Sequence, residues 1–78
     1  MDTQLYLLFW QHKAKTNKRG AAPIFLRITY GGSRAEISTG QSVIPKLWNN
    51  HKEEVKGNSD EAKAINTHLK IIKAKLIT

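Results

Sequence analysis

The stretch from residue 23 to residue 40, PIFLRITYGGSRAEISTG, decides the fold of this chain. Two runs in which apolar and polar residues alternate flank the dipeptide Gly31-Gly32. Alternation with a period of two is typical of a strand with one buried face. Adjacent glycines readily adopt the positive φ angles of a two-residue turn. The stretch therefore predicts a β-hairpin.

The register of this hairpin follows from its loop. With Gly31 and Gly32 as the loop, the pairs are Tyr30 with Ser33, Thr29 with Arg34, Ile28 with Ala35, Arg27 with Glu36, and Leu26 with Ile37. Apolar residues then oppose apolar residues, and a shift by one residue would mix the two faces. The pairing of Arg27 with Glu36 adds at most about 1 kcal/mol when exposed. We therefore expect this register.

The segments next to the hairpin indicate one more strand and an ordered turn. Residues 4–11 are rich in aliphatic and aromatic side chains and contain no Gly or Pro, which predicts a strand followed by a polar loop over residues 12–22. In residues 41–50, Pro45 argues against a central strand and favours a short edge pairing or an ordered turn. We expect Trp48 to anchor this turn in the core.

A C-terminal helix is predicted to begin near residue 59. Either Asn58 with Glu61 forms a capping box, or Ser59 is the cap with Asp60 and Glu61 in the first turn. An apolar stripe at spacings of 3 and 4 follows, formed by Ala62, Ile65, Leu69, Ile72 and Leu76. The stripe needs an apolar surface, and we expect the inner face of the sheet to provide it. The predicted fold class is α+β, a three-stranded antiparallel sheet with one C-terminal helix packed on one face.

Size and composition narrow the class of protein. A chain of 78 residues is expected to form a single domain, too small for a deep enzyme cleft. The absence of cysteine excludes disulfides and thiolate zinc sites and favours the cytoplasm. The apolar run over residues 5–10 is far shorter than the ~20 residues that span a bilayer, and Asp2 has the wrong charge for a signal peptide. We therefore expect no membrane partner.

Positive charge is concentrated in the first part of the chain. The sequence has 13 Lys and Arg against 6 Asp and Glu, for a net charge of +7. No acidic residue lies between Asp2 and Glu36. This excess over so little surface indicates a polyanionic partner.

Catalysis and metal binding find no support in the sequence. His12, His51 and His68 lie in different predicted elements, and no two of them have the i, i+4 spacing of helical metal ligands. No nucleophile, base and orienting group can be named together. We expect no catalytic residue, metal, cofactor or small-molecule substrate.

The cationic sheet face is the remaining candidate site. We expect the inner face to carry Ile24, Leu26, Ile28, Ala35 and Ile37, and the opposite face to carry Phe25, Arg27, Thr29, Arg34, Glu36 and Ser38. Lys13, Lys15, Lys18 and Arg19 follow in the first loop. Arginines can contact guanine in the major groove, and lysines and hydroxyls can hold phosphates. A charged face can also serve solubility alone, but charge of one sign, except at Glu36, favours DNA binding.

The first strand leaves one question open. Leu5, Leu7 and Phe9 lie on one of its faces, and Tyr6, Leu8 and Trp10 lie on the other. One of the two sets must be covered by the loop, by a neighbouring domain or by DNA.

Three segments of the chain together resemble a known family. They are KTNKRGAAPIFLRITYGGSRAEISTG (15–40), VIPKLWN (43–49) and INTHL (65–69). These segments resemble the N-terminal arm-type DNA-binding domain of tyrosine recombinases (phage-integrase family) from mobile elements of the Bacteroides group. The resemblance covers nearly the whole chain.

This resemblance implies a sheet of three strands that docks in the major groove of arm-type sites during integration and excision. By position it assigns DNA contacts to Arg27, Thr29, Arg34, Glu36, Ser38 and the loop cations. It also implies that residues 1–78 are one non-catalytic, N-terminal domain, followed in the same chain by core-binding and catalytic domains. The alternatives are a protein-docking module with a basic, solubilising surface and, ranked last, a module for structured RNA.

Overall fold

The computed structural model describes residues 4–77, so Asp2 lies outside the described residues. Strands β1 (Leu5–Gln11), β2 (Ala22–Tyr30) and β3 (Ser33–Val43) form an antiparallel sheet in the order β1-β2-β3. The short strands β4 (Trp48–Asn49) and β5 (Glu54–Val55) form a second sheet, and α1 spans Asp60–Ile77. The 3-10 turns η1 (Lys13–Lys15) and η2 (Pro45–Leu47) complete the fold. The predicted α+β class is confirmed.

The hairpin has the predicted register. Arg27 pairs with Glu36, Leu26 with Ile37, and Tyr30 with Ser33 across the turn. Gly31 and Gly32 have φ angles of 55° and 83°, which a two-residue turn of this kind requires.

Strand β3 is longer than predicted, because a bulge carries it past Gly40. The register shifts between Pro23 and Phe25, whose partners on β3 are Ser42 and Ser38. Gly40 has a φ of 79°, and the Thr39 hydroxyl donates a 2.7 Å hydrogen bond to the Ile24 carbonyl. Gly40, the last residue of the stretch that predicted the hairpin, therefore accommodates an irregularity within the strand.

Pairing with β2 decides how β1 is oriented. Leu7 lies opposite Ile28 and Phe9 opposite Leu26, so Leu7 and Phe9 belong to the inner face. Phe9 is buried and Leu7 packs against the core. The other set of β1 side chains, Tyr6, Leu8 and Trp10, therefore shares the outer face with Arg27.

Helix α1 begins with the second of the two predicted caps, the one formed by Ser59. The Ser59 hydroxyl oxygen accepts a 3.1 Å hydrogen bond from the Ala62 amide. Asp60 and Glu61 lie in the first turn, where the helix dipole favours negative charge. The core lies between this helix and the two sheets; it comprises Phe9, Ile24, Leu26, Val43, Trp48, Val55, Ala62, Ile65 and Leu69.

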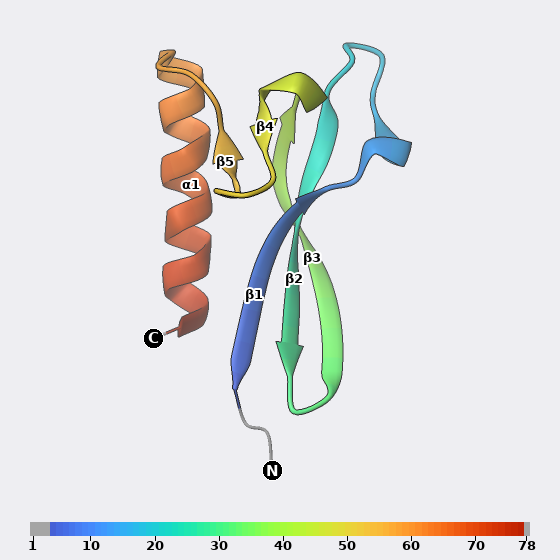
Figure 1. The fold of residues 1–78 in the computed structure, drawn as a ribbon, viewed down its shortest axis with the longest axis vertical. Coiled ribbons are helices and arrows are strands. Elements are labelled where there is room, and N and C mark those ends of the chain that lie inside the picture. Colours follow the sequence, from blue (N-terminus) through green and yellow to red (C-terminus); the bar gives the residue numbers. More distant parts are fainter. Residues whose placement is uncertain (1–3, 78) are drawn as a thin grey trace.

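The helix covers less of the sheet than predicted. Ala35 and Ile37 were expected to face it, but both are exposed, Ile37 by 41%. The hairpin tip extends beyond the C-terminal end of α1 (Figure 1). Leu76, the last residue of the predicted stripe, is correspondingly exposed. The predicted stripe therefore packs on the core from Ala62 to Ile72, and its last residue does not take part.

Residues 41–50 contain both predicted alternatives, the ordered turn η2 and the short strand β4, whereas the partner strand β5 was not predicted. Pro45 starts the ordered turn η2, and Trp48 is the predicted anchor with an exposure of 4%. The Asn66 side chain accepts a 2.8 Å hydrogen bond from the Val55 amide and donates one of 3.1 Å to the Val55 carbonyl. Strands of two residues carry no periodic pattern from which they could be predicted.

Candidate nucleic-acid interface

On the outer face of the sheet, the pairing of the strands aligns the side chains in three rows that run across the strands. Each row takes one side chain from β1, β2 and β3; the rows are Tyr6–Thr29–Arg34, Leu8–Arg27–Glu36 and Trp10–Phe25–Ser38. The side chains from β2 and β3 are those predicted for this face. The β1 residues are an addition, and we call them the β1 column. The face thus runs from apolar on β1 to polar and charged on β3.

Arg27 lies at the centre of this face and is held on two sides. Its Nε lies 2.8 Å from Glu36 Oε1, and its guanidinium carbon lies 5.2 Å from the centroid of the Trp10 ring. A guanidinium over an indole face gains a cation–π attraction in addition to the ion pair. These contacts orient the Arg27 side chain before any partner binds.

Arg34 is placed differently. It is exposed beside the hairpin turn, and within residues 4–77 its guanidinium forms no ion pair or hydrogen bond. Its planar group is therefore available for a bidentate contact. In the same row Thr29 is half-buried, while Ser38, two rows away, is exposed and accepts a 3.2 Å hydrogen bond from the Gly40 amide.

The first loop folds over one end of the outer face. Lys15 Nζ lies 5.4 Å from the centroid of the Phe25 ring. The His12 ring lies 5.0 Å from that of Trp10 and 5.8 Å from that of Phe25. Lys15 is therefore beside the sheet face, and Lys13 is an exposed residue of the same short turn.

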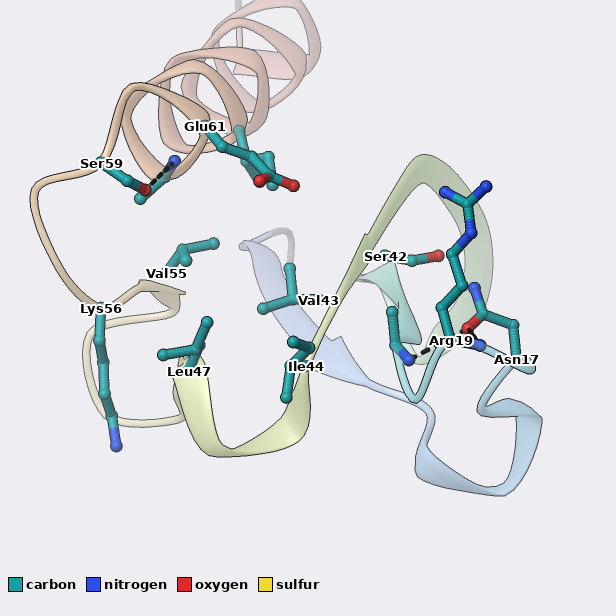
Figure 2. Close-up of a pocket in the computed structure, with 13 residues that line it drawn as sticks. Asn17, Arg19, Ser42, Val43, Ile44, Leu47, Val55, Lys56, Ser59 and Glu61 are labelled. Carbon is teal, nitrogen blue, oxygen red and sulfur yellow. Dashed lines mark hydrogen bonds between the residues drawn. The ribbon is translucent and has the colours of Figure 1, made fainter.

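The remaining loop cations lie elsewhere. Asn17 Oδ1 accepts hydrogen bonds from the amides of Arg19 and Ala21, which shapes a turn that includes Lys18. Arg19 lines a pocket of about 320 Å³ near the first turn of α1 (Figure 2). The lining of the pocket is mixed: apolar side chains such as Val43, Leu47 and Val55 lie beside polar ones such as Ser42 and Glu61. Lys15 therefore contacts a ring of the outer face, whereas Arg19 lines this pocket.

The described residues give no support for a metal site or a membrane-spanning helix. Between residues 4 and 77 no group of His, Cys, Asp or Glu side chains could hold a metal ion. Over the same part of the chain no helix is long and apolar enough to cross a membrane.

The comparison with protein families decides between the remaining interpretations. A model described as Arm DNA-binding domain matches residues 9–78. The chain belongs to this family. The resemblance to arm-type DNA-binding domains of tyrosine recombinases is confirmed, and this Arm DNA-binding domain is a DNA-binding, non-catalytic module. No curated protein and no solved structure gave a match.

Sequence reasoning did not assign the β1 column to the outer face of this Arm DNA-binding domain. Both faces of β1 are apolar, so its alternation alone does not show which face is buried. The information that identifies the inner face of β1 lies in β2. The β1 residues opposite the apolar side chains Leu26 and Ile28 of β2 are Phe9 and Leu7, which therefore belong to the inner face. That inference requires knowing which β1 residue lies opposite which β2 residue.

Proposed function

We propose that the outer sheet face of this domain binds double-stranded DNA in the major groove and recognises specific arm-type sites. The observation that carries the proposal is the contrast between Arg27, oriented by Glu36 and Trp10, and Arg34, whose guanidinium has no protein partner among the described residues. One arginine is preorganised and the other is available. Both belong to the face of the sheet opposite to the one from which Phe9, Ile24 and Leu26 pack into the core.

The dimensions of the sheet support insertion into a groove. Neighbouring strands lie about 4.8 Å apart, so the outer strands of a three-stranded sheet are separated by roughly 10 Å. The major groove of B-DNA is about 12 Å wide and admits a β-ribbon. A three-stranded face of this width suits the groove.

Each predicted contact residue has a chemical role in this arrangement. Arg34 and Arg27 donate to O6 and N7 of guanine, and Glu36 orients Arg27. Thr29 and Ser38 offer hydroxyl groups to base edges or phosphates. Lys13, Lys15, Lys18 and Arg19 contact phosphates on either side of the groove and carry no sequence information.

The test starts with selection of binding sites from a pool of random duplexes, followed by methylation interference. Methyl groups at guanine N7 project into the major groove, and those at adenine N3 project into the minor groove. We expect interference at guanine N7 and an affinity that falls steeply with salt. Interference at adenine N3 alone would place the domain in the minor groove. Salt-insensitive association with a protein, without DNA binding, would favour the docking module, and preference for duplex RNA would favour the third alternative.

We also propose that the domain serves a tyrosine recombinase during integration and excision of a mobile element. Arm-site binding by one domain and strand cleavage by another would let one protein connect two DNA segments. In the full-length protein, deletion of residues 1–78 should abolish recombination between substrates that contain arm sites and leave cleavage of isolated core sites intact. Loss of both activities equally would contradict a separate arm-binding role.

A further inference from the structure

We infer that the β1 column reads thymine methyl groups, so that the recognised site carries thymine next to the guanines contacted by the arginines. This inference rests on the proposed function and adds a base preference to it. It starts from two exposed residues: Tyr6 is 54% exposed and Leu8 is 40% exposed on the face that carries Arg27 and Arg34.

Within residues 4–77, the loop contacts cover only one end of the outer face and leave Leu8 and Tyr6 exposed. The loop packs on the row of Trp10 and Phe25, with His12 and Lys15 against their rings. No such contact reaches Leu8 or Tyr6, which lie in the next two rows. Their apolar surface is therefore open to solvent in the free domain and available to a partner.

The surrounding charge favours DNA over protein as that partner. Leu8 lies directly opposite Arg27 in the β1–β2 register, and Tyr6 shares a row with Arg34. An apolar protein surface that covered Leu8 would also remove these guanidinium groups from water. Among the side chains of the three rows, only Glu36 is acidic and able to compensate for that loss of hydration, and it pairs with Arg27. DNA supplies phosphates and guanine acceptors to the cations in the same contact.

Within the major groove, thymine offers the matching group. Base edges there present hydrogen-bond donors and acceptors, and the C5 methyl of thymine is the apolar group among them. Adjacent strands lie about 4.8 Å apart and base pairs about 3.4 Å, so Leu8 reaches a base within one or two pairs of the one that Arg27 contacts. The inferred preference is thymine at that distance from guanine.

The experiment replaces each thymine of the selected site by deoxyuridine, which lacks the methyl group alone. For the unmodified domain we expect about a fourfold loss of affinity at one or two positions, the effect of one buried methyl group. In Leu8→Ala the same replacement should cause no further loss. Leu5→Ala is the matched control, because Leu5 is 41% exposed on the same strand but belongs to the opposite face. It should retain the full sensitivity to deoxyuridine.

The outcomes separate this inference from the proposed function. Guanine N7 interference without any effect of deoxyuridine would overturn the thymine contact and leave major-groove binding intact. Equal sensitivity in Leu8→Ala and in the unmodified domain would also overturn it. Absence of duplex binding would overturn both. Should Leu8→Ala fail to fold, as judged by circular dichroism, Tyr6→Ala replaces it in the same cycle, with the same expected loss of sensitivity.

Discussion

Arg27 and Glu36 face each other across strands β2 and β3, with Nε and Oε1 2.8 Å apart. Both side chains are about one-third exposed, at 33% and 38%. A cross-strand pair of this exposure adds only about 0.2–1 kcal/mol to stability. Its main effect is to hold the guanidinium over the Trp10 ring, where it points along the outer face.

Replacement of Glu36 by Gln should strengthen binding to any duplex. The change removes a negative charge from the surface that approaches phosphates, an effect of about 1 kcal/mol at 4 Å in water. Fluorescence anisotropy with unrelated duplexes should show the gain at low salt and its disappearance at high salt. Weaker binding to the selected site alone would instead show that the contribution of Glu36 to specific recognition, through its orientation of Arg27 or a base contact of its own, outweighs its repulsion of phosphates.

Arg34→Ala should lower specific affinity by about 1–3 kcal/mol, since it removes a bidentate base contact. The melting temperature should stay unchanged, because the Arg34 guanidinium has no partner among residues 4–77. Lys63→Ala removes an exposed cation from α1 and serves as the control. If both variants bound equally well, the role of Arg34 in recognition would be refuted.

Lys15→Ala should weaken binding to all sequences alike. A phosphate contact contributes about one unit to the slope of log affinity against log salt, so the slope should become shallower by that amount. Titrations at several salt concentrations measure it, with Lys70→Ala, an exposed helix residue, as the control. An unchanged slope would remove Lys15 from the phosphate contacts.

Asn66→Ala should destabilise the fold. It deletes the hydrogen bonds between the Asn66 side chain and both backbone groups of Val55, which leaves part-buried polar groups unpaired. Loss of such partners costs about 1–3 kcal/mol. Urea unfolding followed by circular dichroism measures the free energy of unfolding, and Thr67→Ala, an exposed neighbour on α1, should leave it unchanged. Equal midpoints for the two variants would contradict the bridging role of Asn66.

Several features of the candidate site could be predicted from neighbouring residues. The strand alternation around Gly31-Gly32 predicted the pairing of Arg27 with Glu36 and hence the outer positions of β2 and β3. The extent of helix coverage could not be predicted in this way. Ile37 has the same alternation as Leu26 and lies directly opposite it, yet Ile37 is exposed and Leu26 is fully buried, because β3 is an edge strand and β2 is the central strand of the sheet.

The sequence by itself determined the features that depend on local geometry. Side-chain alternation, the paired glycines of the turn and a helix cap at Asn58 or Ser59 each depend on residues that are close in the sequence or paired across one hairpin, so they can be predicted from the order of residues along the chain. Tertiary structure alone decided which face of β1 is outward and which loop cations accompany it. Both faces of β1 are apolar, so its orientation follows from burying Phe9 against Leu26 and the helix. The folding of the loop then places Lys15 beside Phe25 on the outer face and Arg19 at a pocket whose lining also includes the first turn of α1, because packing contacts join residues that are distant in the sequence.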